Sequence, residues 1–308
     1  MSAPAAYTLT NPHNGQLAIK IFSFRDNSHF DHLQRLNYYS VILLAEGEGT
    51  LSADFAQHDF RGPNLFFFAP YQPFMFTSAE NVGGVVLHFH PDFFCIHKHQ
   101  KEVACHGVLF NNIYQSPALA LSGDDLNEFH ALVEQMKPAI IKPELGQHEL
   151  LVSWLKIFLI RASRLKTEQA PLSSAGPADN RKTELAQNLR EAIESHYRTK
   201  HGASAYAAML HISPKVLGRI TKTYFNKTIT NLVSERIIIE AKRELYLTSR
   251  TVKEIAYGLG FEDEYYFSRF FKINADVSPQ TFRETVGFAR AEESSGAILK
   301  GLAEPGRN

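Results

Sequence analysis

The first ninety residues alternate short apolar runs with turn residues. YYSVILLAEGEGTL (residues 38–51) is an apolar run, a glycine-containing turn and a return. DFRGPNLFFFAPYQPFMFTS (59–78) adds two short aromatic strands broken by prolines, and NVGGVVLHFHP (81–91) adds another. Short strands with frequent turn residues are typical of a β-sandwich or small barrel. We therefore expect a β-rich segment up to about residue 90.

Two helices are expected next. GDDLNEFHALVEQMKPAI (123–140) places its apolar residues at helical spacing. GQHELLVSWLKIFLIRASRLK (146–166) is apolar around most of its circumference between Leu150 and Ile160. A helix that is apolar on most sides must be covered by more than one neighbour. It is either a core helix or, as we favour, a helix shared between the core and a subunit interface.

The segment from 184 to 290 is helical and repeats itself. SAYAAMLHISPKVLGRITKTYFNKTI (204–229) and TVKEIAYGLGFEDEYYFSRFFKINADVSPQTFRE (251–284) each predict a short helix, a turn and a second helix with a polar, basic outer face. TNLVSERIIIEAKRELYLTS (230–249) predicts a long amphipathic helix between them. A short helix, a tight turn and a second exposed helix describe a helix-turn-helix.

Capping residues mark where these helices begin. Thr251 and Glu254 have the spacing of a capping box, which satisfies free N–H groups at a helix start. Asp263 can cap the helix after the second turn. Ser213 can cap the corresponding helix of the first repeat, and Pro214 suits its first position.

The chain divides at a stretch without apolar periodicity. Residues 166–183 are rich in Pro, Gly, Ser, Ala and charges, which predicts an exposed linker. The tail 291–308 is poor in core residues, so we expect it to be disordered. We therefore expect one domain over 1–165, the linker, and a second domain over 184–290.

The net charge of zero hides an asymmetry. Residues 1–183 carry 14 Lys and Arg against 17 Asp and Glu, whereas residues 184–290 carry 16 against 12. This mild basic excess permits nucleic-acid binding without arguing for it. No apolar run is long enough for a membrane span, no secretory signal is evident, and two cysteines do not make a disulfide framework. These features predict a cytoplasmic protein with no membrane partner.

A histidine-rich stretch between residues 87 and 110 suggests a metal site at first. His88 and His90 would share one face of a strand, but a metal needs a third converging ligand. Cys95 and Cys105 lie ten residues apart and form no Cys-x-x-Cys motif. No Ser-His-Asp, nucleotide-binding or paired-carboxylate pattern is present either. We predict no metal, no cofactor, no catalytic residue and no enzyme; the histidines are strand and loop residues, some of which could line a ligand pocket.

The helical repeats carry a family resemblance. The second half resembles the AraC/XylS class of bacterial transcription regulators, and the first half resembles, more loosely, their cupin-like arm through Gly-Glu-Gly-Thr-Leu (47–51). The matching residues of the second half are Ile-Ala (255–256), Gly-Phe (260–261), Tyr-Phe-Ser-Arg-x-Phe-Lys (266–272), Ser-Pro (278–279), Phe-Arg (282–283) and, in the linking helix, Arg-Ile…Glu-Ala-Lys (236–242).

The resemblance implies an α+β protein of two domains: a cupin-like N-terminal β-barrel with two following helices and an all-α double helix-turn-helix. It implies a sequence-specific transcription regulator, more an activator than a repressor, modulated by a small-molecule effector in the first domain. The implied partners are double-stranded DNA, RNA polymerase and a second copy of the chain, in the bacterial cytoplasm at the nucleoid. Two alternatives stay open: a cupin-type metal-dependent enzyme fused to a DNA-binding unit, and a regulator whose first domain only dimerises.

The resemblance also implies the DNA contacts. Each second helix would enter a major groove, and the linking helix would hold the two about one DNA turn (~34 Å) apart. Asn226 and Asp276 stand where the family commonly has glycine after these helices, but both tolerate a left-handed backbone. Gly218 reads no base. The implied base contacts are Lys215, Arg219, Glu264, Tyr265 and Arg269, and the phosphate contacts are Lys222, Lys272 and the N–H groups at the Ser213-capped helix start.

Overall fold

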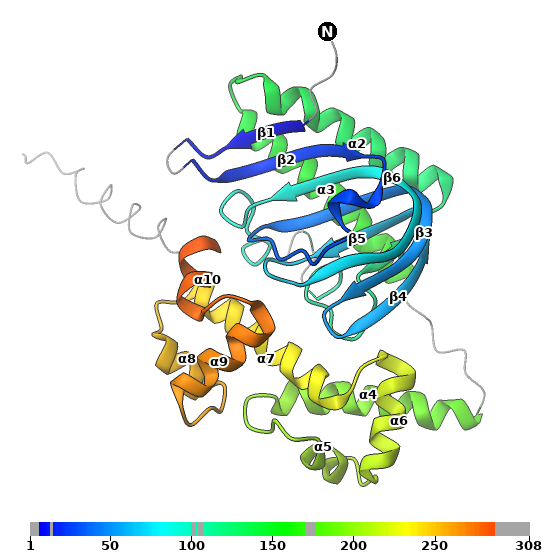
Figure 1. Cartoon of the computed structure of the whole chain (residues 1–308), viewed down its shortest axis with the longest axis vertical. Helices are drawn as coiled ribbons and strands as arrows, with labels where there is room; N and C mark the ends of the chain where they lie inside the picture. The colour runs from blue at the N-terminus through cyan, green and yellow to red at the C-terminus, as the bar shows by residue number, and fades with distance from the viewer. Residues whose placement is uncertain (1–5, 13–14, 100–102, 104–106, 170–176, 287–308) are drawn as a thin grey trace, which may run out of the picture.

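A computed structural model describes residues 6–12, 15–99, 103, 107–169 and 177–286. An N-terminal half, up to residue 169, holds a β-sheet backed by two helices, and a C-terminal half, from residue 177, is helical (Figure 1). None of the helices in these ranges has the length and apolar content needed to cross a bilayer.

The sheet has seven antiparallel strands in the order β1-β2-β6-β3-β5-β7, and β4 pairs with β3. In the described part of the chain, β1 and β7 are the two ends of this order and do not pair with each other. The sheet is therefore not closed, and the expected cupin-like barrel is not confirmed. The strands are β1 (Ala6–Thr10), β2 (Leu17–Phe24), β3 (Tyr39–Ala53), β4 (Ala56–Arg61), β5 (Asn64–Phe68), β6 (Phe74–Phe89) and β7 (Ala118–Ala120), with a 3-10 turn, η1 (Asn27–His29), after β2.

Strand β6 corrects one expectation. The sequence predicted separate strands on either side of residue 80, but β6 runs through without a break for 16 residues. Within it, the backbone at Gly84 lies so close to β3 that a Cβ on Gly84 would sit 2.1 Å from the Leu43 carbonyl oxygen. A glycine at such a close approach lets the two long strands stay paired while they bend, and the pairing shifts register just beyond Leu44.

The two faces of the sheet bury different side chains. One face packs against α2 (Gly123–Ile141) and α3 (Gln147–Glu168), the two helices that the helical spacing predicted. Ser122 and Asp125 form a capping box at the start of α2. The opposite face carries a cluster rich in phenylalanine: Phe24, Phe30, Phe60, Phe66, Phe68, Phe74 and Phe76.

The described part of the C-terminal half, residues 177–286, consists of seven helices. Helix α3 extends to Glu168 and α4 begins at Pro177, so helices occupy both ends of the predicted linker. The predicted disordered tail lies outside the described residues, and the domain boundaries stay predictions. The helices are α4 (Pro177–His196), α5 (Ala203–Met209), α6 (Pro214–Phe225), α7 (Ile229–Leu247), α8 (Val252–Gly258), α9 (Glu264–Ala275) and α10 (Pro279–Val286).

The two halves contact each other along α7 and α10. Lys242 of α7 donates a 2.9 Å hydrogen bond from Nζ to the Pro70 carbonyl oxygen. The hydroxyl groups of Tyr71 and Thr285 lie 2.7 Å apart, which joins the sheet half to α10. In Figure 1, α7 crosses from the α4–α6 cluster to the α8–α10 cluster below the sheet.

Candidate nucleic-acid interface

The C-terminal half contains two copies of one local structure. Helices α5 and α8 are both 7 residues long, and α6 and α9 are both 12 residues long. We call α4–α6 the first unit and α8–α10 the second unit, and α6 and α9 the recognition helices. The predicted pair of helix-turn-helix arrangements, joined by the long helix α7, is therefore present.

Both recognition helices begin at the predicted caps. The Ser213 hydroxyl accepts a 3.3 Å hydrogen bond from the Val216 N–H. The Asp263 carboxylate accepts hydrogen bonds of 3.0 Å from two N–H groups at the start of α9. At the other ends, Asn226 (φ 53°) and Asp276 (φ 63°) adopt the left-handed conformation, as predicted from their tolerance of it.

The outer side of α6 is cationic. Successive helical residues turn by about 100°, so Lys215, Arg219 and Lys222 share one side, and all three are exposed. Leu217 lies on the opposite side and is buried. A Cβ built on Gly218 meets nothing within 4 Å, so this position opens onto the same surface.

The outer side of α9 is cationic and aromatic. Tyr265 is 73% exposed, and Arg269 and Lys272 are exposed beside it. Phe267 and Phe271 fix this orientation because both are fully buried on the inner side. The structure thus places the predicted contacts Lys215, Arg219 and Lys222 together on one exposed side of α6. It places Tyr265, Arg269 and Lys272 together on one exposed side of α9.

Glu264 differs from the other site residues. It is the first residue of α9 and is only partly exposed. Its carboxylate lies in the first turn of α9, whereas the first turn of α6 has no acidic residue. A helix N-terminus attracts anions. The start of α6 is therefore the better place for a phosphate, and the start of α9 already has a carboxylate beside it.

Sequence reasoning missed two residues of the α9 surface. Tyr266 is 58% exposed and Ile273 is 77% exposed. Both lie within about 60° of Arg269 around the helix axis, so helical spacing could have identified them. An exposed isoleucine on a recognition helix can contact the methyl group of thymine.

The cationic side chains of both recognition helices are not neutralised by neighbouring carboxylates in the described part of the chain. Within the described part of the chain, Lys215, Arg219, Arg269 and Lys272 form no ion pair with a carboxylate. The pairing of Arg269 with Glu262, which would compete with DNA, is not formed.

The histidine-rich stretch shows no arrangement of a metal centre. His88 lies in β6, and burial together with Lys20 lowers its pKa to about 3. His90 follows the end of the strand, and its Nε2 lies 3.2 Å from the Thr285 carbonyl oxygen. No three or more His, Cys, Asp or Glu residues come together as metal ligands among the residues described. Cys105 and His106 lie outside those residues.

The comparisons agree with this arrangement. A family model described as a helix-turn-helix domain matches residues 206–285. An uncharacterized HTH-type transcriptional regulator in the cgkA 5′ region of Pseudoalteromonas carrageenovora is 30% identical over 125 residues, which cover 40% of this chain and 74% of that protein. The HTH-type transcriptional activator RhaR of Cronobacter sakazakii is 25% identical over 214 residues, which cover 68% of this chain and 72% of that protein.

A solved structure, an apo form of ToxT from Vibrio cholerae with a single substitution, aligns with 88% of this chain and 98% of its own, at 16% identity and a TM-score of 0.38. The sequence relatives are named as regulators of transcription, and with them this chain belongs to the AraC/XylS family of DNA-binding transcriptional regulators.

Proposed function

We propose that the protein binds two adjacent major grooves of one operator, one with each recognition helix, and activates transcription in response to a small effector. The observation that carries this proposal is the pair of capped helices with exposed cationic sides on either end of α7. A helix of 19 residues is about 28 Å long, close to one DNA turn of about 34 Å.

Residue roles follow from chemistry and position. Arg219 and Arg269, near the middle of each exposed side, would read guanine by bidentate hydrogen bonds. Lys222 and Lys272 lie one turn further toward the helix ends and would bind phosphates. The remaining base contacts are assigned to Lys215, Tyr265 and Glu264, of which Glu264 can accept a hydrogen bond from cytosine.

The experiment is a selection of bound duplexes from a random DNA pool with the full-length protein. We expect two enriched blocks with centres about 10 base pairs apart, and an affinity that falls steeply with salt as phosphate contacts release counterions. Selection of no sequence, or a flat salt dependence, would contradict the proposal.

An effector could act through the turns that end the recognition helices. Asn226 donates a 2.9 Å hydrogen bond from Nδ2 to the Gln57 carbonyl oxygen in the N-terminal half. Asp276 forms a 2.9 Å ion pair with Arg35, also in that half. A ligand that favours one arrangement of the N-terminal half would therefore bias both recognition helices.

We assign the effector to a cleft of about 950 Å³ between the two halves. Lys166 lines it, is buried, and donates a 2.7 Å hydrogen bond from Nζ to the Ser116 carbonyl oxygen. Burial lowers the pKa of Lys166 to about 8, so its ammonium group stays mostly charged at neutral pH. No carboxylate pairs with it in the described residues, which favours an effector with an acidic group.

Small carboxylic acids and their uncharged amides test this assignment by thermal shift. We expect some acids to stabilise the wild-type protein, and Lys166→Met to lose that response. If no compound of either kind shifts the melting temperature, the alternative of an N-terminal half that only dimerises is favoured. Metal analysis of the purified protein tests the enzyme alternative; we propose no catalytic role.

We further propose a homodimer that contacts RNA polymerase in the bacterial cytoplasm. Support for the dimer comes from the outer side of α3, where Leu150, Trp154 and Ile157 form a stripe at helical spacing. Leu150 and Ile157 are exposed and Trp154 is partly exposed. Two copies would let two weak operator contacts act together.

A further inference from the structure

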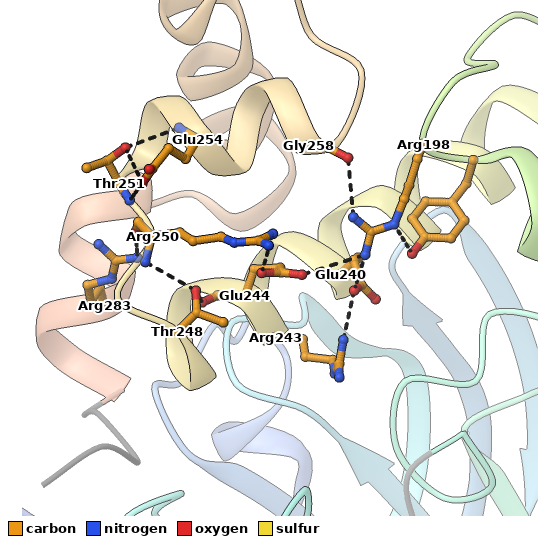
Figure 2. Close-up of polar contacts among 11 residues, drawn as sticks. Arg198, Glu240, Arg243, Glu244, Thr248, Arg250, Thr251, Glu254, Gly258 and Arg283 are labelled. Atoms are coloured by element: carbon orange, nitrogen blue, oxygen red, sulfur yellow. Dashed lines mark hydrogen bonds and ion pairs between the residues drawn. The ribbon is translucent and has the colours of Figure 1, made fainter.

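The two helix-turn-helix units touch each other directly, beyond their connection through α7. The loop between α4 and α5 lies against the turn between α8 and α9. Arg198 of that loop donates a 3.2 Å hydrogen bond from Nη1 to the Gly258 carbonyl oxygen (Figure 2). The Nε2 atom of His201 lies 3.0 Å from the Leu259 carbonyl oxygen. Because a carbonyl oxygen only accepts hydrogen bonds, the imidazole must be the donor.

The backbones of the same two segments are also in direct contact, at Gly260 and Arg198. Gly260 has φ +80°, and a Cβ on it would lie 2.1 Å from the Arg198 carbonyl oxygen. The obstacle is backbone rather than a flexible side chain. Next to it, the His201 and Phe261 rings pack with their centroids 5.0 Å apart. The contact between the units therefore combines hydrogen bonds with close packing.

Arg198 also connects this contact to α7. Its Nη2 lies 2.7 Å from the Glu240 carboxylate, and its Nε donates to the Tyr197 hydroxyl at 3.0 Å. Burial raises the pKa of Glu240, but Arg236, Arg243 and Arg198 together outweigh burial and lower the pKa below its ordinary value. Glu240 is thus a charged anchor at neutral pH, and Arg198 joins the first unit, α7 and the second unit.

The last turn of α7 is held to the second unit as well. Arg283 of α10 donates hydrogen bonds to the carbonyl oxygens of Leu245 and Arg250. Arg250 in turn lies 3.3 Å from the Glu244 carboxylate on α7. Figure 2 shows Arg283, Arg250 and Glu244 in one row with Glu240 and Arg198. Because the last two turns of α7 are held to the first unit at Glu240 and to the second unit at Glu244 and Leu245, the second unit has little freedom to rotate against the first.

We propose that Arg198 and His201 are positioning residues that fix the distance and the rotation between the two recognition helices. The protein would then accept operators with only one spacing between their two blocks. One inserted base pair moves the second block by about 3.4 Å and turns it by about 34°. Units held together cannot follow that turn, whereas units joined by α7 alone could. This inference rests on the proposed function.

The test uses the selected operator and versions with one base pair removed, one added or two added. We expect wild-type affinity to fall by about tenfold or more on each altered spacing, as after loss of one bidentate base contact. The affinity of the Arg198→Ala, His201→Ala double variant should fall by less than about threefold on the same altered spacings. Its absolute affinity for the original operator should fall too, because the helices are no longer preset.

Arg243→Ala is the matched control. Arg243 also binds Glu240, at 2.9 Å, but makes no hydrogen bond or ion pair with the second unit among the described residues. It should keep the wild-type spacing profile. If the double variant fails to fold, Arg198→Lys with His201→Ala replaces it, because lysine retains a charge for Glu240 without the second donor for Gly258. His201→Gln, which keeps an N–H donor, should restore part of the selectivity.

The outcomes separate the two proposals. If the wild-type protein selects no sequence, the proposed function fails. If it selects an operator but wild type and a folded variant discriminate spacings equally, the positioning role is overturned while the function stands. A variant that loses affinity equally on all spacings also overturns the positioning role, since a merely destabilised protein would behave in that way.

Discussion

Arg35 and Asp276 form a 2.9 Å ion pair between the N-terminal half and the turn that ends the second recognition helix. Asp276 has φ +63° and ends α9 in the left-handed conformation. The same residue therefore both ends the recognition helix and binds the N-terminal half. Asn226 does the same after α6, through Gln57. A glycine could form either turn, but it could not make these contacts.

Replacement of Arg35 by alanine should loosen the second unit. The Asp276 side chain is 65% exposed, so we expect the free energy of unfolding to fall by no more than about 1 kcal/mol. Hydrogen exchange in α10 and at the end of α9 should become faster. Arg25→Ala, at an exposed arginine after β2, is the control. Unchanged exchange in α10 would show that the ion pair does not hold the unit.

Arg269→Ala and Lys272→Ala should weaken DNA binding in different ways. Loss of a bidentate base contact at Arg269 should cost about 1–3 kcal/mol on the operator and little on unrelated DNA. Loss of a phosphate contact at Lys272 should weaken binding to the operator and to unrelated DNA alike. It should also reduce the slope of log affinity against log salt concentration by about 1. Titrations of both duplexes at two salt concentrations measure this. An equal loss on both duplexes would make Arg269 a backbone contact, and melting temperatures control for folding.

Substitutions on α3 should distinguish its two sides. Ile157 is 38% exposed, so Ile157→Asp should dissociate the dimer at micromolar concentration while each copy stays folded. Phe158 is fully buried, so Phe158→Asp should unfold the protein because it buries an unpaired charge. Sedimentation measures the dissociation and circular dichroism measures the unfolding. Gln135→Asp, at an exposed position of α2, is the control. A monomeric wild type would refute the dimer.

Glu240 should make the C-terminal half sensitive to acid. Its pKa is lowered in the folded state, so its contribution to stability is complete above the ordinary value of 4.5 and is lost as the pH falls through the folded pKa. Glu240→Gln should lower stability at neutral pH and flatten the decline below 4.5. Urea unfolding over this range measures both, with exposed Glu262→Gln as control. Parallel declines in wild type and Glu240→Gln would contradict the assignment.

The helical half could be predicted because its signals are local. The capping box of Thr251 and Glu254 and the cap at Ser213 each lie within four residues, and both are formed. The sheet was harder because strand continuity and closure depend on distant pairing. The approach of Gly84 to Leu43 joins positions about forty residues apart, and no short pattern reveals it.

The same distinction applies to the candidate site. Helical spacing correctly placed Lys215, Arg219 and Arg269 on exposed sides. An apolar residue beside buried Leu217 would be expected to face inward, but Val216 in the first turn of α6 is 39% exposed. The contact of Arg198 with Gly258 spans 60 residues, and only the folded chain brings the two together.

A substitution at Gly218 could change the DNA sequence that the protein recognises. The space above it is empty, so a longer side chain would meet no obstacle within 4 Å of its Cβ and would extend from the cationic side of α6. Replacing a mid-helix glycine also favours the helix by up to about 1 kcal/mol. A single base change in a glycine codon produces arginine or serine. After gene duplication, one copy could thus acquire a new base contact in one mutational step without loss of stability, while the other copy keeps the original target genes.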